Sequence, residues 1–140
     1  MRSDFVVTDS HGASRALIEV KARSGTSPTW ATELRKNLFD EASGQSQDYF
    51  VIVTPDSLYV WRPGAGVAEA PREFPIRQAL GKYLNGTNLD VAGVSRFTFE
   101  MIVQAWLGDL LRGRAAEGMP ADLMAAVEDG RLLTESESSR

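Results

Sequence analysis

The chain has 140 residues, of which 43% are hydrophobic and 24% charged, as in an ordinary globular protein large enough to bury a core. It contains no cysteine and one histidine, His11, which excludes disulfides, zinc–thiolate sites and a multi-histidine metal site within one chain. The net charge of −4 argues against a protein that binds nucleic acid through its overall positive charge. No apolar run approaches the roughly 20 residues that a membrane span needs.

The first 62 residues predict the order strand, strand, helix, strand, strand. Ser27 is a suitable N-cap for the helix and Pro28 suits its first position. An unbroken apolar run, Tyr49-Phe-Val-Ile-Val, is typical of a central strand buried on both faces. The predicted strands cover residues 4–9, 15–22, 49–53 and 58–62, and the helix covers 28 to about 43.

The second half of the chain predicts helices. A Gly/Pro/Ala-rich loop at 63–74 precedes them, and the longest helix has Phe99, Trp106 and Leu110 among its residues for burial. The expected helices cover residues 75–84, 96–112 and 120–128. These elements divide the chain into an α/β domain at 1–112, a helical appendage at 113–130 and a disordered acidic tail at 131–140.

The predicted fold class is α/β, with a mixed sheet of about four strands flanked by helices. A helix connects the strands at 15–22 and 49–53, so these two strands should be parallel neighbours by the right-handed crossover rule. The cysteine-free composition and the lack of a signal peptide fit a protein of the cytoplasm.

The first hairpin brings together two acids and a lysine. Its turn is centred near residues 11–12, so residues whose numbers sum to about 23 should face each other, which places Asp4 opposite Glu19. Lys21 follows Glu19 by two residues and shares its face of the strand. A slip of one residue in the register would break this arrangement.

This set of side chains suits phosphodiester chemistry. Mg²⁺ prefers oxygen ligands and is often held by one or two carboxylates, here Asp4 and Glu19, to which the backbone carbonyl of Val20 could add. A lysine such as Lys21 orients the nucleophile and stabilises developing negative charge. The alternative is an ordinary cross-strand charge pair on a surface strand, because Glu-x-Lys is a common pattern.

The segments Asp4-Phe-Val-Val and Ala16-Leu-Ile-Glu-Val-Lys-Ala resemble the PD-(D/E)xK nuclease superfamily, which includes restriction endonucleases. The resemblance covers about residues 2–62 and, more loosely, 96–112. It implies a restriction-endonuclease-like fold and a nuclease dependent on Mg²⁺ or Mn²⁺ that acts on nucleic acid, with DNA the expected substrate. Asp4 and Glu19 match the metal-binding acids of the family and Lys21 its catalytic lysine.

Two positions depart from the family pattern. Ser3 stands where proline is usual, and no helix precedes the first motif strand, although the family core begins with one. A homo-oligomer, a partner protein or the helix at 96–112, with Glu100 as stand-in acid, would have to supply the missing helix. The alternative function is an inactive nuclease-like interaction or assembly module in a larger complex, such as one of a defence system, and a fragment of a larger enzyme is a third reading.

Four further residues are candidates for substrate contacts. Arg23 and Ser27 lie in or next to the loop that follows Lys21, and Arg35 and Asn37 are expected on or near the exposed side of the helix that starts at Pro28. The simpler interpretations are a capped loop and a solvated helix face. His11 is expected to be a solvated turn residue, and the three tryptophans (Trp30, Trp61 and Trp106) are expected in the core rather than stacked on bases.

Overall fold

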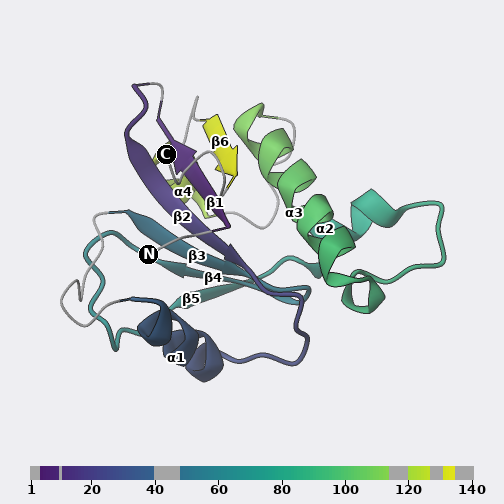
Figure 1. Ribbon diagram of the computed structural model, residues 1–140, viewed down its shortest axis with the longest axis horizontal. Helices are drawn as coiled ribbons and strands as arrows, with labels where there is room; N and C mark the ends of the chain where they lie inside the picture. The colour runs from purple at the N-terminus through teal and green to yellow at the C-terminus, as the bar shows by residue number, and fades with distance from the viewer. Residues whose placement is uncertain (1–3, 10, 40–47, 114–119, 127–130, 135–140) are drawn as a thin grey trace.

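A computed structural model describes residues 4–9, 11–39, 48–113, 120–126 and 131–134. The fold is a mixed sheet of six strands with helices on both faces, and the strand order is β5-β4-β3-β2-β1-β6 (Figure 1). The strands are β1 (Phe5–Thr8), β2 (Ser14–Val20), β3 (Tyr49–Val53), β4 (Ser57–Trp61), β5 (Arg72–Pro75) and β6 (Arg131–Thr134), and the helices are α1 (Pro28–Leu38), α2 (Arg77–Gly81), α3 (Arg96–Leu111) and α4 (Ala121–Ala126), with short 3₁₀ turns η1 (Lys82–Leu84) and η2 (Val91–Gly93).

The predicted core of the sheet is confirmed. β2 and β3 are parallel neighbours, with Ile18 opposite Val51, and every other strand pair is antiparallel. β3 is central and lies between β2 and β4, which explains its unbroken apolar sequence, because both of its faces are covered.

Two strands were not predicted. β5, at the end of the segment expected to be a loop, pairs with β4, and β6, in the segment expected to be a disordered tail, pairs with β1. The domain division is therefore wrong at its C-terminal end, since β6 belongs to the sheet and Leu123 of α4 lies in the same apolar cluster as Ile18. Residues 135–140, the rest of the predicted tail, lie outside the described residues.

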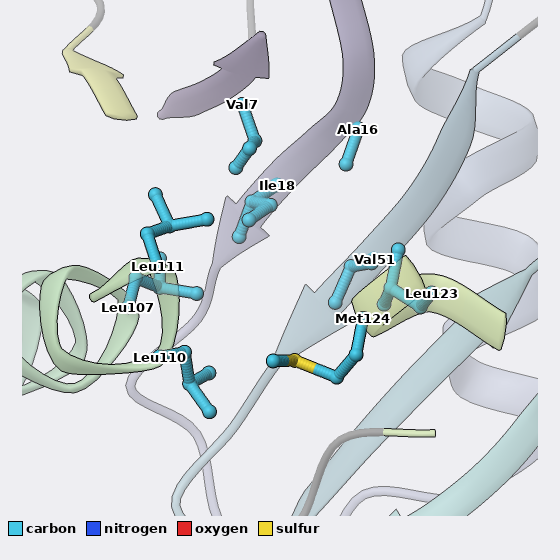
Figure 2. Close-up of a pocket in the computed structure, with 9 residues that line it drawn as sticks. All are labelled: Val7, Ala16, Ile18, Val51, Leu107, Leu110, Leu111, Leu123 and Met124. Atoms are coloured by element: carbon cyan, nitrogen blue, oxygen red, sulfur yellow. The ribbon is translucent and has the colours of Figure 1, made fainter. Parts of the chain in front are cut away.

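The helices divide between the two faces of the sheet. α1 covers one face, where Ala31 packs against Phe50 and Trp61. α2, α3 and α4 cover the opposite face, and Figure 2 shows side chains of α3 and α4 meeting those of the sheet around a small apolar pocket. Lining residues include Ile18, Val51, Leu110, Leu123 and Met124.

Local sequence signals explain where the main helices begin. The Ser27 hydroxyl accepts a hydrogen bond from the amide of Trp30, and Ser95 caps α3 in the same way through the amide of Thr98. α1 ends at Leu38, earlier than the predicted end near residue 43, and residues 40–47 lie outside the described part. Among the described residues, no helix is long and apolar enough to span a membrane.

Candidate metal-binding site

At the open end of the first hairpin, next to Asp4 and Glu19, the strands pair in the predicted register. Phe5 lies opposite Ile18 and Val7 opposite Ala16, so the paired numbers sum to 23. The register shifts between Val7 and Thr8, near the turn and away from the acids. Asp4 immediately precedes β1, and continuing the register puts it across from Glu19.

A hydrogen bond from a backbone amide orients the side chain of Asp4 where β1 begins. The amide of Val20 donates to Oδ2 of Asp4 over 2.7 Å. The carboxylate therefore accepts from an amide at the end of the ladder between β1 and β2, and this bond orients it beside the end of β2. Sequence reasoning assigned Val20 a role through its carbonyl, and that role stays a prediction.

Glu19 is a buried carboxylate inside the α1 face of the sheet. It pairs with Ile52 of β3, which in turn pairs with Tyr59 of β4, and its side chain is only 8% exposed. Oε1 lies 3.3 Å from Nζ of Lys21, whereas Oε2 is buried without a hydrogen-bond partner among the described residues. An unsatisfied buried carboxylate oxygen is costly, and such atoms occur at sites that bind a ligand or an ion.

The environment of Glu19 favours its neutral form. The pKa of Glu19 is raised to about 7, chiefly by burial and then by the negative charge of Asp4 and a hydrogen bond that protonated Glu19 can share with it, while the ammonium of Lys21 acts in the opposite direction. When Glu19 is ionised, two carboxylates therefore share one site with a single ammonium, that of Lys21. A cation placed between them would relieve both the repulsion and the burial of unpaired charge.

Lys21 forms the solvent-facing side of the site. Its backbone amide donates to the carbonyl of Val53, which holds the residue next to β3, and its side chain is 35% exposed. The site thus has the buried carboxyl group of Glu19 at its base and the partly exposed ammonium of Lys21 at its rim. An anionic ligand approaching from solvent would meet Lys21 before it reached Glu19.

The loop after Lys21 is held by side chains of β4 and of the turn that precedes it. The amide of Gly25 donates to Oδ2 of Asp56 over 3.2 Å, and the hydroxyls of Thr26 and Tyr59 are 2.8 Å apart. The sequence Thr54-Pro-Asp-Ser57 predicts a turn first and a functional loop only as the alternative. Its acid and its position after β3 were the available signal, because a turn at that end of a strand lies beside the end of its parallel neighbour.

Two of the four predicted substrate contacts lie near this loop. Arg23 is exposed, and its guanidinium carbon lies 5.7 Å from the ring centroid of Trp30. Ser27 is also exposed, but its hydroxyl oxygen accepts the capping hydrogen bond from the amide of Trp30. Arg23 is therefore available to an incoming ligand, whereas the Ser27 hydroxyl is already engaged as the N-cap of α1.

The expected position of Arg35 is wrong, while Asn37 is exposed as expected. Arg35 is 2% exposed, and its guanidinium donates to the carbonyls of Ala65 and Gly66 over 3.0 and 2.7 Å. Aromatic rings of Phe39, Phe50 and Trp61 surround it within 5.2 to 6.0 Å. The side chain lies on the sheet side of α1, where its long apolar stem packs and its charged end binds backbone oxygens.

Glu100 is not brought to the two acids. α3 packs on the face of the sheet that carries Ile18 and Val20, opposite the face of Glu19, and the carboxylate of Glu100 accepts from Nε of Arg96 over 3.1 Å. His11 is an exposed turn residue, as expected. Trp61 and Trp106 are buried and Trp30 is half-buried, as their strand and helix spacing indicated.

The donor set fits a hard divalent cation held by few protein ligands. Within the described ranges, no group of three or more His, Asp or Glu side chains is placed to hold a metal, and the site offers the two carboxyl groups of Asp4 and Glu19. Mg²⁺ keeps several waters and is commonly bound by one or two carboxylates. The partnerless Oε2 of Glu19 and its neighbour Asp4 are consistent with that mode.

Comparisons of the chain with protein-family models, with curated proteins and with solved structures gave no match. The resemblance to PD-(D/E)xK nucleases, and the restriction-endonuclease-like fold that it implies, therefore stay predictions based on the motif residues.

Proposed function

We propose that this protein is a metal-dependent nuclease that hydrolyses phosphodiester bonds of nucleic acid, with DNA as the substrate, on a restriction-endonuclease-like sheet. The observation that carries the proposal is the buried carboxylate of Glu19, which has one partnerless oxygen and lies between Asp4 and Lys21. A surface charge pair would leave both partners solvated, whereas this acid is desolvated beside a second acid.

Asp4 and Glu19 would hold Mg²⁺ or Mn²⁺. The bound ion would supply positive charge to the phosphate and lower the pKa of a water. The hydrogen bond from the Val20 amide keeps Asp4 in one orientation, and burial keeps Glu19 in another, so the ligands are preorganised.

Lys21 would contact the phosphate of the scissile bond. With a cation beside Glu19, the ammonium no longer has to balance that carboxylate and is free to donate to phosphate oxygens. Arg23 would bind a neighbouring phosphate from the same loop, since its guanidinium is exposed on the same stretch of chain. A place of action in the cytoplasm remains part of the proposal.

The test is cleavage of plasmid and single-stranded DNA in the presence of Mg²⁺ or Mn²⁺. The wild type should cleave, and Lys21→Ala and Glu19→Gln should reduce the rate by about 10²-fold or more, the typical loss of a charge-stabilising group. Lys36→Ala is the matched control, because Lys36 is an exposed lysine of α1 and should leave the rate unchanged.

A second candidate function, an inactive assembly module, is favoured because the described residues contain no group of three or more His, Asp or Glu side chains that could hold a metal. A measurement of Mg²⁺ binding distinguishes the two functions, because the site of an inactive module would no longer bind the cation. If Mg²⁺ neither raises the melting temperature nor shifts amide resonances near Val20, and no DNA is cleaved, the nuclease proposal is wrong and the module is favoured.

A further inference from the structure

α3 is apolar on two opposite faces, although only one of them packs against the sheet. The inner face buries six large side chains, of Phe99, Ile102, Val103, Trp106, Leu107 and Leu110. On the outer face, Phe97 is 71% and Met101 53% exposed. Large apolar side chains that share one face of a helix normally pack against a partner, but the described residues provide none for Phe97 and Met101.

The outer face forms one stripe along the helix. Phe97, Met101, Gln104 and Gly108 follow one another at spacings of three or four residues, so they line up on one side. No charged residue stands at a position of this stripe, and one charged group, the Arg112 guanidinium, reaches over it at Gly108. The side chains of Arg96 and Glu100 form an ion pair beside its first half, and those of Asp109 and Arg112 form one beside its second half.

The two halves of this stripe are complementary, because one offers an aromatic ring and the other offers a cation. The first half carries two large apolar side chains, and the second half has no side chain at Gly108. The guanidinium of Arg112 folds back over Gly108, with Nη2 3.2 Å from the point that a Cβ would occupy. One half thus presents the ring of Phe97, and the other presents the planar guanidinium of Arg112 lying over Gly108.

We propose that a second copy of this chain covers the stripe, with the two α3 helices antiparallel about a twofold axis. In this register the paired residue numbers sum to about 205, so Phe97 of each copy stacks on the Arg112 guanidinium that covers Gly108 of the other, and Met101 lies against Gln104. Such an arrangement joins a ring to a cation twice in one symmetric contact.

The contact is small, and this sets its strength. A pair of single helices buries less than the ~800 Å² per partner of a standard interface, so dissociation should occur at a constant on the order of tens of micromolar. Association therefore depends on concentration. It uses neither Asp4 nor Glu19, so it holds or fails independently of the proposed nuclease activity.

Sedimentation across a concentration series measures this directly. The full-length chain of 15.3 kDa should move toward twice that mass as its concentration rises. Met101→Ser should weaken the association about tenfold or more by removing a buried apolar side chain. Leu89→Ser is the matched control, because Leu89 is 58% exposed but lies outside α3, and it should leave the association unchanged.

A pair of charge variants tests the register. Phe97→Lys places an ammonium against Arg112 of the other copy and should abolish the dimer, whereas Phe97→Glu places a carboxylate there and should retain it better. Equal losses in both variants would overturn the antiparallel register. A wild type that stays monomeric at the highest concentration would overturn the proposal as a whole.

A single cysteine adds a geometric test in a chain that has none. In the proposed register the two Gln104 positions are three residues out of step, about 4.5 Å along the helices, so Gln104→Cys should form a disulfide-linked dimer under mild oxidation. Leu89→Cys should remain a monomer under the same conditions. Equal cross-linking of both variants would indicate random collision and contradict the proposed contact.

Discussion

Glu19 and Lys21 share one ion pair in which only half of the carboxylate takes part. Oε1 of Glu19 lies 3.3 Å from Nζ of Lys21, and Oε2 is buried without a hydrogen-bond partner among the described residues. A pair that served stability alone would be expected to satisfy both oxygens, since an unsatisfied buried acceptor costs about 1–3 kcal/mol. The geometry therefore suits a ligand that binds the second oxygen.

The first prediction concerns the pH dependence of stability. The pKa of Glu19 is about 7 in the folded protein and near 4.5 ordinarily, so the folded state holds an extra proton between these values. Stability from this group is present below pH 4.5 and is lost as the pH rises through 7. Glu19→Gln removes the effect, so the variant should be more stable than the wild type by about 1–3 kcal/mol at pH 8 and similar to it at pH 4.5.

Urea unfolding of both proteins between pH 4.5 and 8 measures this difference. Comparing the two proteins cancels the contributions of other carboxylates, such as Asp9 and Asp122, whose hydrogen bonds lower their pKa. A difference that stays constant with pH would contradict the raised pKa of Glu19.

The second prediction concerns Asp4. Asp4→Asn keeps a side-chain oxygen for the Val20 amide but removes the charge that raises the pKa of Glu19, so that pKa should fall. Asp4→Ala also removes the acceptor and should cost about 1–2 kcal/mol more than Asp4→Asn. A carboxyl ¹³C titration of Glu19 and urea unfolding measure the two effects. An unchanged Glu19 titration in Asp4→Asn would show that the two acids do not interact.

Most of the sheet and its helices could be predicted because their signals are local. The apolar run of β3, the N-cap Ser27 and the turn at Gly12 each specify their own element. The hairpin turn also fixed the register, and with it the opposition of Asp4 and Glu19. These residues lie within 16 positions of each other, so a short-range argument was enough to bring them together.

The features that sequence reasoning missed depend on distant partners. β6 has only four residues, with a weak strand sequence, and it forms because the free edge of β1 accepts it. Arg35 was expected outside because arginine is a surface residue, but the carbonyls of Ala65 and Gly66 lie 30 and 31 positions away. Asp56 reaches the loop at Gly25 across 31 positions. Each contact requires the fold to be known first.

The third prediction concerns the buried guanidinium of Arg35. Arg35→Met keeps most of the apolar stem but leaves the carbonyls of Ala65 and Gly66 without their donor, so unfolding free energy should fall by about 2–4 kcal/mol. Lys36→Met is the control, since this exposed neighbour should change stability by less than about 0.5 kcal/mol. Equal effects in urea unfolding would place Arg35 at the surface.

The last prediction concerns the edge strand β6. Leu132 pairs with Val7 of β1, so Leu132→Pro removes a backbone donor inside β6 and disfavours its pairing along β1. The variant should lose about 1–3 kcal/mol of stability, and amides of β1 should exchange with solvent faster. Leu132→Ala is the control, because it shortens the side chain but keeps the amide. If the β1 amides exchange at the same rate in the wild type and in Leu132→Pro, β6 does not protect that edge, and the sheet ends at β1.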